Sequence, residues 1–478
     1  MKRGKKLLIL AAVLIVVAGG AFAALEFIPD EEAEVTESEV IYSLDAATLT
    51  NLSWTCDGET VSFDYNGEDW TYADDADFPL DPTRLNTMLS TLEEVTASKT
   101  IEAADDLAQY GLEEPECTIT VTADAETVIS VGSETSLDGL RYVSIGDGSV
   151  YLVDSGIYSS FSYGLYDLVS KEAIPDMSDL VSFTAERASG TLVIDYLEDS
   201  GLAYSDRYTY FAADGGEYTA LDSTLAGDFI SQITGLTWGE CVDYKAELKD
   251  LADYGLDDPA VTVTVNYIET TEVETNETDE DGNPVYETRE EEKSFTLELG
   301  DYAGEGVYAR IAGSEMVYLI DSAICGSLLY TEVSELLPDD VILLDWDRTE
   351  GFDITLDGET YAVTMALEES TDDEGSTSYD YVYTLDGEDV DFTDVLSSLE
   401  ALESEGSAEG VSTELGEAIS FVFHRSTETF TEVTLTIYNY DSTTCIASLS
   451  EGRPQFVSRD AVEDIVEAVT ALVAPTEE

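Results

Sequence analysis

Residues 107–121 read LAQYGLEEPECTITV, and residues 251–265 repeat them as LADYGLDDPAVTVTV. The shared pattern is L-A-x-Y-G-L-x-x-P-x-x-T-x-T-V, with Tyr254 matching Tyr110 at a spacing of 144 (254 − 110). A glycine supplies the left-handed backbone conformation that ends a helical turn, and a proline shortly after it prevents the helix from resuming. The threonine-rich tail alternates polar and apolar residues, as half-buried strands do. The pattern therefore predicts a short helical turn followed by a strand, in two copies.

The role of this repeated signature is predicted to be structural. It contains no nucleophile, metal-binding cluster or phosphate-binding loop, and we predict no catalytic, cofactor-binding or metal-binding residue. The signature residues are Tyr110, Gly111, Leu112, Pro115, Tyr254, Gly255, Leu256 and Pro259.

The sequence around each signature predicts an α+β module of antiparallel sheet and helices. The first module spans residues 44–172, with hairpin turns at Asp57-Gly58 and Asn66-Gly67. Asp81 caps a helix that begins with Pro82, and Asp222 caps the matching helix of the second module. The apolar stripe of this helix is Leu85, Met88, Leu89, Leu92 and Val95, and its counterpart in the second module is Phe229, Ile230, Ile233 and Leu236.

The second module, residues 177–338, contains an insertion relative to the first. Its closing strand repeats Tyr151 at Tyr318, a spacing of 167 (318 − 151), which exceeds the spacing of the signature by 23. The source is a Glu/Thr-rich stretch at residues 267–292 with a turn at Asp281-Gly282, which predicts a projecting hairpin. Glu277, Asp279, Asp281 and Gly282 also resemble the start of a calcium loop. Thr288 replaces the required glutamate at position twelve and Pro284 interrupts the loop, so we favour the turn.

Residues 339–478 are predicted to form a third, degenerate module. Residues 354–360 (ITLDGET) are similar to residues 54–60 (WTCDGET). The signature itself is missing, and a loop at residues 403–410 replaces it. The predicted apolar stripes of the two helices are Val395, Leu396, Leu399 and Leu402, and Val462, Ile465, Val466 and Val469.

The N-terminus predicts a membrane anchor. Residues 1–6 are basic, and residues 7–28 form an almost uninterrupted apolar run, long enough at about 1.5 Å per residue to cross a bilayer core. Residues 29–43 follow as an acidic spacer, and this charge order places the bulk of the chain on the extracytoplasmic side of the cell membrane. A cleaved signal peptide is the alternative, with Ala21-Phe22-Ala23 as its cleavage site. We favour a single-pass anchor because the apolar run continues beyond that site.

The charge balance excludes one class of partner. The chain has 104 Asp and Glu against 19 Lys and Arg, a net charge of −85. Such a surface repels phosphate backbones, so no nucleic-acid partner is predicted. We interpret the acid as a solvated coat in preference to a specific cation-binding site, although cation buffering stays open.

The cysteines, the histidine and the tryptophans could serve catalysis or binding, but we predict structural roles for them. The five cysteines are widely spaced and odd in number, so buried free thiols are expected and no disulfide framework is indicated. His424, the only histidine, lies in an alternating run and is predicted to be a strand-face residue. Gly146-Asp147-Gly148 predicts a turn between strands. Trp54, Trp70, Trp238 and Trp346 are expected to fill sheet cores in preference to a sugar-stacking surface.

The chain resembles the bacterial domain-of-unknown-function 4340 family. The resemblance covers residues 44–329 and implies a membrane-anchored extracytoplasmic protein, in a family often associated with ABC-type export systems of the gliding-motility kind. It implies no catalytic residue. The residues that carry it are Trp70, the helix after Pro82, Tyr110-Gly111-Leu112, Pro115, Val131-Gly132 and Tyr151-Leu152-Val153, and in the second copy Tyr254-Gly255-Leu256, Pro259, Leu299-Gly300 and Tyr318-Leu319-Ile320.

These observations lead to a non-enzymatic hypothesis. We expect a membrane-anchored binding or scaffold protein without a cofactor. Its expected role is that of an auxiliary component of an ABC-type transport system, with transporter subunits or other envelope proteins as partners. The alternative is a cell-envelope glycan-binding protein or a carboxylate-dependent hydrolase.

Overall fold

The computed structural model describes residues 38–474, except 103, 105, 136–138, 279–283, 372–376, 414–415 and 451. The predicted anchor at residues 7–28 lies outside the described residues, as does most of the acidic spacer. Within the described part of the chain, no helix is long and apolar enough to cross a membrane. The chain divides into two compact units, Met1–Glu172 and Ala173–Glu478.

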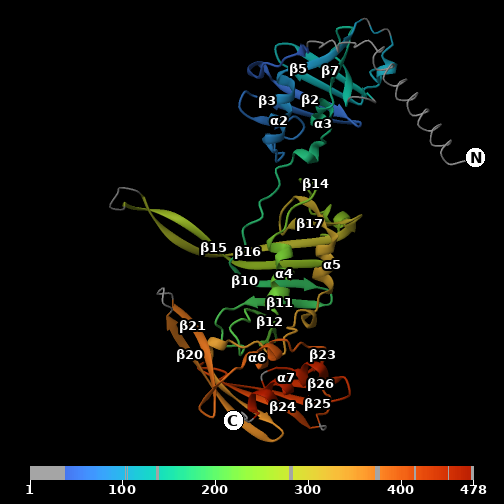
Figure 1. Ribbon diagram of the computed structural model, residues 1–478. Coiled ribbons are helices and arrows are strands. Elements are labelled where there is room, and N and C mark those ends of the chain that lie inside the picture. The colour runs from blue at the N-terminus through green and yellow to red at the C-terminus, as the bar shows by residue number, and fades with distance from the viewer. Residues whose placement is uncertain are drawn as a thin grey trace, which may run out of the picture. The chain divides into compact units, whose positions relative to one another are not determined.

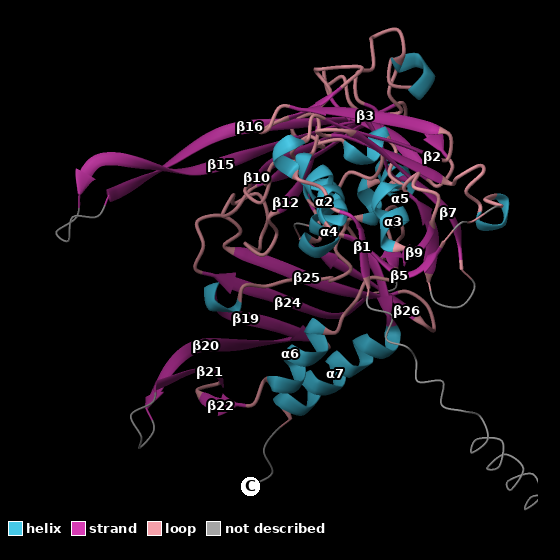
Figure 2. Cartoon of the chain, turned by 90° about the horizontal axis from the view of Figure 1, so that it is seen from above, coloured by secondary structure: helices cyan, strands magenta, loops and turns pink. Residues whose placement is uncertain are grey.

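Three nine-stranded sheets make up the described chain (Figures 1 and 2). Neighbouring strands run antiparallel, which confirms the prediction of repeated modules built on antiparallel sheets, and helices are few. The first sheet has the order β1-β5-β9-β8-β7-β6-β2-β3-β4. Its strands are β1 (Glu39–Tyr42), β2 (Asn51–Cys56), β3 (Glu59–Tyr65), β4 (Trp70–Tyr72), β5 (Val95–Ile101), β6 (Cys117–Thr122), β7 (Glu126–Glu134), β8 (Leu140–Ser144) and β9 (Val150–Asp154).

The second sheet begins the larger unit, and its order is β13-β12-β11-β10-β15-β16-β17-β18-β14. Its strands are β10 (Leu180–Arg187), β11 (Gly190–Tyr196), β12 (Tyr210–Asp214), β13 (Glu217–Ala220), β14 (Cys241–Asp243), β15 (Val261–Thr278), β16 (Pro284–Ala303), β17 (Gly306–Ile311) and β18 (Val317–Asp321).

The third sheet has the order β22-β21-β20-β19-β24-β25-β26-β27-β23. The loop predicted at residues 403–410 contains one of its edge strands, β23. The strands are β19 (Thr349–Leu356), β20 (Glu359–Thr371), β21 (Thr377–Leu385), β22 (Glu388–Val390), β23 (Gly406–Ser407), β24 (Glu417–Arg425), β25 (Glu432–Asn439), β26 (Thr444–Leu449) and β27 (Gln455–Ser458).

All three modules follow one connection scheme. Apart from β1, which pairs with β5 at the edge of the first sheet, a group of antiparallel neighbouring strands comes first, then a helix, then a strand (β5, β14 or β23), then a four-stranded meander. The strand after the helix pairs with the last strand of the meander, as β5 does with β9, β14 with β18 and β23 with β27. The third segment is therefore a copy of the module although it lacks the signature.

Helices cover one face of the sheet in the second and third modules. In the second module, Phe229 and Ile233 of α4 and Leu328 of α5 pack on alternate residues of β15 and β16, such as Val263 and Leu297. In the third module, α6 and α7 lie together on one face of the sheet (Figure 2). The helices are α2 (Pro82–Glu93), α3 (Gly156–Phe161), α4 (Ser223–Thr234), α5 (Ser322–Tyr330), α6 (Thr393–Glu400) and α7 (Arg459–Val473), with short 3-10 turns η1 (Ala46–Thr48), η2 (Ala108–Tyr110), η3 (Leu165–Leu168), η4 (Leu251–Tyr254), η5 (Val333–Glu335) and η6 (Trp346–Arg348).

The N-terminal caps of α2 and α4 are those predicted from the sequence, but the predicted apolar stripes run past the ends of the helices. Asp81 accepts a hydrogen bond from the Thr83 amide, and Asp222 accepts one from the Leu225 amide. Val95, predicted as the last residue of the first stripe, is buried but begins β5. Leu236 and Leu402 likewise lie just beyond their helices. A strand can continue the apolar face after the helix ends, so periodicity alone does not find the boundary.

The insertion in the second module forms the predicted hairpin. Strands β15 and β16 pair in continuous register from Val261↔Leu299 outward to Glu274↔Tyr286, and Thr278↔Pro284 adds a pair after a register shift. Alternate residues are buried as far as Tyr267, whereas the strands beyond residue 268 are mostly exposed, so the ribbon extends past the sheet (Figure 1). The Asp281-Gly282 turn lies outside the described residues. Pro284 and Thr288, which depart from the calcium-loop pattern, both lie on strand β16.

The expectation of five free thiols was wrong. Cys56 at the end of β2 lies directly opposite Cys117 at the start of β6, with a Cα–Cα distance of 4.3 Å, and the two form a disulfide. Cys241, Cys325 and Cys445 are buried and take no part in a disulfide. The pairing was not predictable from spacing because it depends on β6 returning to β2 across 61 residues.

Alkylation tests this disulfide. Iodoacetamide added to the denatured, unreduced protein should modify three cysteines, and five after reduction, as counted by mass spectrometry. Replacing both Cys56 and Cys117 with alanine should lower the free energy of unfolding of the first module by up to about 4 kcal/mol, because the open chain gains loop entropy. Modification of all five cysteines without reduction would contradict the pairing.

Candidate functional site

The two signatures form the same turn. Gly111 and Gly255 have left-handed φ values of 68° and 66° at the ends of η2 and η4. The amide of the next residue closes each turn. Leu112 donates to the Leu107 carbonyl at 3.0 Å, and Leu256 donates to the Leu251 carbonyl at 2.8 Å.

A second glycine explains why each turn sits so close to the sheet. A Cβ at Gly132 would lie 2.3 Å from the carbonyl oxygen of Tyr110, and a Cβ at Gly300 would lie 2.1 Å from that of Tyr254. Any side chain at these strand positions would therefore collide with the backbone of the turn. This contact explains why the Val131-Gly132 and Leu299-Gly300 pairs occur together with the signature: the glycine of each pair admits the turn.

The remaining signature residues also lie in matching environments. The ring of Tyr110 packs against Tyr142 with centroids 4.9 Å apart, and that of Tyr254 packs against Tyr308 at 5.0 Å. Both leucines are buried and both prolines are half-buried, and these are Leu112, Leu256, Pro115 and Pro259. The signature thus positions the turn on the sheet in both copies, and its residues line neither hollow described below.

The candidate site is a hollow of about 870 Å³ between the second and third modules. This volume falls within the range of ligand pockets, roughly 300–1,000 Å³. Two sheet edges border it: Tyr218 and Ala220 belong to β13, and Gly406 and Ser407 to β23. Its other lining residues include Leu202, Tyr204, Tyr208, Leu337, Asp339, Asp340, Glu405, Phe430, Leu449, Arg453 and Gln455.

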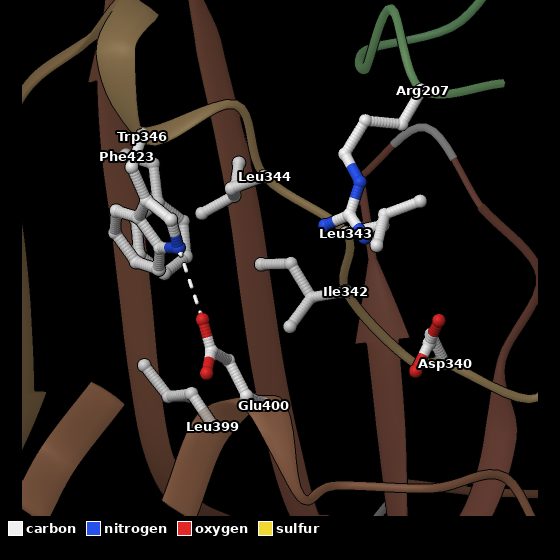
Figure 3. A pocket seen from close by; sticks show the side chains of 9 residues that line it. All are labelled: Arg207, Asp340, Ile342, Leu343, Leu344, Trp346, Leu399, Glu400 and Phe423. Carbon is white, nitrogen blue, oxygen red and sulfur yellow. Dashed lines mark hydrogen bonds between the residues drawn. The ribbon is translucent and has the colours of Figure 1, made fainter. Parts of the chain in front are cut away.

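A smaller hollow of about 280 Å³ shares Asp340 with the larger one (Figure 3). Trp346 donates its indole N–H to Glu400 of α6 at 3.4 Å. Arg207 of the second module lines this hollow together with Leu343 of the third segment. This hollow therefore combines an aromatic wall with one cationic and two acidic side chains.

A buried carboxylate joins the two modules beside these hollows. Asp345 accepts hydrogen bonds from the Ser205 hydroxyl at 2.8 Å and from the Asp206 amide at 3.0 Å, both in the second module. It also accepts one from Arg425 of β24 at 3.1 Å, and the two side chains are only 8% and 2% exposed. Tyr204 adds a second link, since its hydroxyl accepts the Leu343 amide at 2.8 Å. These contacts hold the walls of the hollows in place.

Asp340, which lines both hollows, has a raised pKa. Burial raises its pKa, and the neighbouring carboxylate of Asp222 raises it further, against the opposing effect of Arg207. Burial also raises the pKa of both Tyr204 and Tyr208, so their hydroxyls stay protonated at neutral pH. A cationic group entering the hollow would favour the ionised form of Asp340.

The other residues considered from the sequence lie apart from the larger hollow. His424 is on β24 with its ring nitrogens 3.1 Å from Asp353 and 3.4 Å from Glu432, as a strand-face residue. Gly146 and Gly148 have positive φ in the turn between β8 and β9. Three tryptophans pack into the modules, namely Trp54, Trp70 and Trp238, and only Trp346 lines a hollow.

The residues of the module joint were missed at the sequence level. One signal was available: Arg425 continues the alternation of Phe421 and Phe423, so a charge falls on the buried face of the strand and requires a partner. The partner, Asp345, lies 80 positions earlier, and nothing in its local sequence marks it.

The close contact of Gly132 and Gly300 with the turns predicts that a side chain at either position destabilises the fold. Gly132→Ala and Gly300→Ala should each lower the free energy of unfolding by roughly 1–3 kcal/mol, because the methyl group overlaps the tyrosine carbonyl. Gly326→Ala is the matched control, since it lies in α5 with no atom within 4 Å of the new Cβ. The control should be neutral or stabilising in urea unfolding. Equal behaviour of Gly300→Ala and Gly326→Ala would refute the contact.

The buried contacts of Asp345 between the second and third modules predict that loss of its charge destabilises the larger unit. Asp345→Asn should destabilise the larger unit by about 3 kcal/mol, because the Arg425 charge stays buried without its counterion. Glu409→Gln removes the carboxylate of an exposed pair with Arg453 and should cost less than about 1 kcal/mol. Chemical unfolding of both variants measures the difference, and equal losses would show that Asp345 does not hold the joint.

Comparison with known proteins agrees with this repeated architecture. No curated protein and no solved structure matches the chain. The model of a domain of unknown function, DUF4340, matches residues 70–207 and 213–417. The two matches begin 143 positions apart (213 − 70), close to the spacing of the signatures. Because these matches cover most of the 478 residues, the chain belongs to the DUF4340 family.

Proposed function

We propose that the chain is a membrane-anchored extracytoplasmic binding or scaffold protein that serves an ABC-type transport complex. The observation that carries the binding role is the larger hollow between the second and third modules. Its walls are held by buried contacts of Asp345 and Tyr204, so the site is largely formed before a ligand arrives. A preformed site loses less entropy on binding than a disordered one does.

Two observations support the extracytoplasmic location. The apolar run at residues 7–28 follows four basic residues, an order that leaves the rest of the chain outside the cytoplasm. The disulfide between Cys56 and Cys117 agrees with that location, because disulfides persist in oxidising compartments and are rare in the cytosol.

The transport partner rests on the family resemblance. Proteins that share the signature are often associated with ABC-type export systems, and a repeated, anchored chain would suit a scaffold beside the permease. Co-isolation of the membrane-solubilised protein with a permease or an ATPase subunit would test this part of the proposal separately from the location.

A glycan-binding or hydrolytic role is the second candidate. The observation that favours it is Asp340, whose raised pKa is the property of a general acid and whose side chain lines both hollows. Asp339 and Glu405 lie in the same wall as possible second carboxylates. The ligand test in the next subsection includes a glycan probe for this reason.

Cysteine labelling in whole cells tests the location. Leu248 is 85% exposed, so a Leu248→Cys variant should react with a membrane-impermeant maleimide, whereas the three native cysteines outside the disulfide are buried. Gly4→Cys, in the basic N-terminal segment, is the control and should react only after lysis. Labelling of Leu248→Cys only after lysis would place the chain in the cytoplasm and overturn the proposal.

A further inference from the structure

Among the residues that the structure describes, the backbone that borders the larger hollow has no partner strand on its outer side. Strand β13 ends the second sheet and β23 ends the third, and both line the hollow. An exposed edge is a template for another strand, and natural proteins generally cover or blunt such edges. Here two edges face one cavity, which distinguishes this place from the far edge of the third sheet at β22.

The register shows which groups of β13 are available. The Leu221 amide donates to the Tyr210 carbonyl at 2.9 Å, and pairing continues through Ala212↔Thr219 to Asp214↔Glu217. In an antiparallel pair, alternate residues face the partner strand, so the backbone groups of Tyr218 and Ala220 point away from β12. They are free to pair with an added strand.

The side chains around these edges fit a peptide. Leu202, Leu449 and Phe430 provide apolar contact. The Oε1 atom of Gln455 is shielded from solvent and has no hydrogen-bond partner among the described residues, so it can accept an N–H from a ligand. Phe430 has a positive φ of 50°, a conformation that bulky residues rarely adopt and that often occurs at ligand sites.

The charge around the hollow selects among peptides. Asp339, Asp340 and Glu405 line it. Arg453, the one basic residue among the described lining residues, shares its charge with Glu409 at 3.6 Å. The wall is therefore acidic, and basic side chains would be attracted to it. A second copy of this chain, with its net charge of −85, would be repelled.

We propose that this hollow binds an extended polypeptide segment bearing lysine or arginine, which adds a strand to the free edge of β13. Main-chain hydrogen bonds to Tyr218 and Ala220 supply affinity, and the acidic wall supplies the preference for basic side chains. The inference rests on the proposed binding function and names the class of ligand.

Selection from a library of random seven-residue peptides on phage, with the purified full chain as bait, tests the proposal. Enriched peptides should be rich in Lys and Arg, and fluorescein-labelled synthetic copies should bind saturably in anisotropy titrations. Ala220→Pro should weaken this binding at least tenfold, because proline removes the outward N–H while the bonds to β12 remain. Lack of enrichment would overturn the proposal.

Asp389→Pro is the matched control. Strand β22 is also a free edge beside a two-residue turn, and by its register Asp389 faces outward as Ala220 does. This variant should bind the peptides as the native chain does. Equal affinity of Ala220→Pro and Asp389→Pro would overturn the proposal.

If Ala220→Pro does not fold, a variant that changes the charge of the hollow tests the same proposal. Glu405→Lys should weaken binding of the basic peptides several-fold, while Glu388→Lys on β22 should leave it unchanged. If a chitin oligosaccharide bound saturably and displaced the peptide, the hollow would be a glycan site instead. Because these experiments use the purified chain, their failure is distinct from a failure of the labelling test of location.

Discussion

The close approach of the signature turn to its sheet is the constraint on which each complete module depends. The carbonyl oxygens of Tyr110 and Tyr254 occupy the space where a side chain would begin at Gly132 and Gly300. The turn needs one glycine for its left-handed end, and the strand needs another to admit the turn. Two glycines separated by more than twenty residues are thus one structural unit. The proline and the strand that follow take their positions from it.

The third module shows what happens when this constraint is absent. It keeps the strand order, the helix after the hairpins and the edge strand β23, but has no signature turn. Its core instead receives Tyr204, Tyr208 and Phe211 from the second module. The second and third modules are consequently joined through a common apolar core and the buried Asp345, and the hollows lie beside that joint. The third module, although it lacks the signature, thus forms one wall of the candidate binding site.

Local chemistry made much of the fold predictable, and long-range contacts did not. Asp81 and Asp222 act as predicted because a cap is decided by its nearest neighbours. The Cys56–Cys117 disulfide was missed because it follows from strand order, which no local pattern reveals. The hollow was equally inaccessible, since Tyr218, Gly406 and Gln455 carry no shared motif and meet only through the packing of two modules. Arg425 differs from these residues, because its place on the apolar face of β24 indicates from the sequence alone that the charge needs a buried partner.

Hydrogen exchange at the two signature turns tests the central claim most directly. In the native chain the amides of Leu112 and Leu256, each bonded back to the start of its turn, should be protected to a similar degree. In the Gly132→Ala variant, protection should fall at Leu112 and stay unchanged at Leu256, and Gly300→Ala should give the reverse. If either substitution left its own turn fully protected, or if the two native turns exchanged at very different rates, the turns would not depend on these glycines and the account would be wrong.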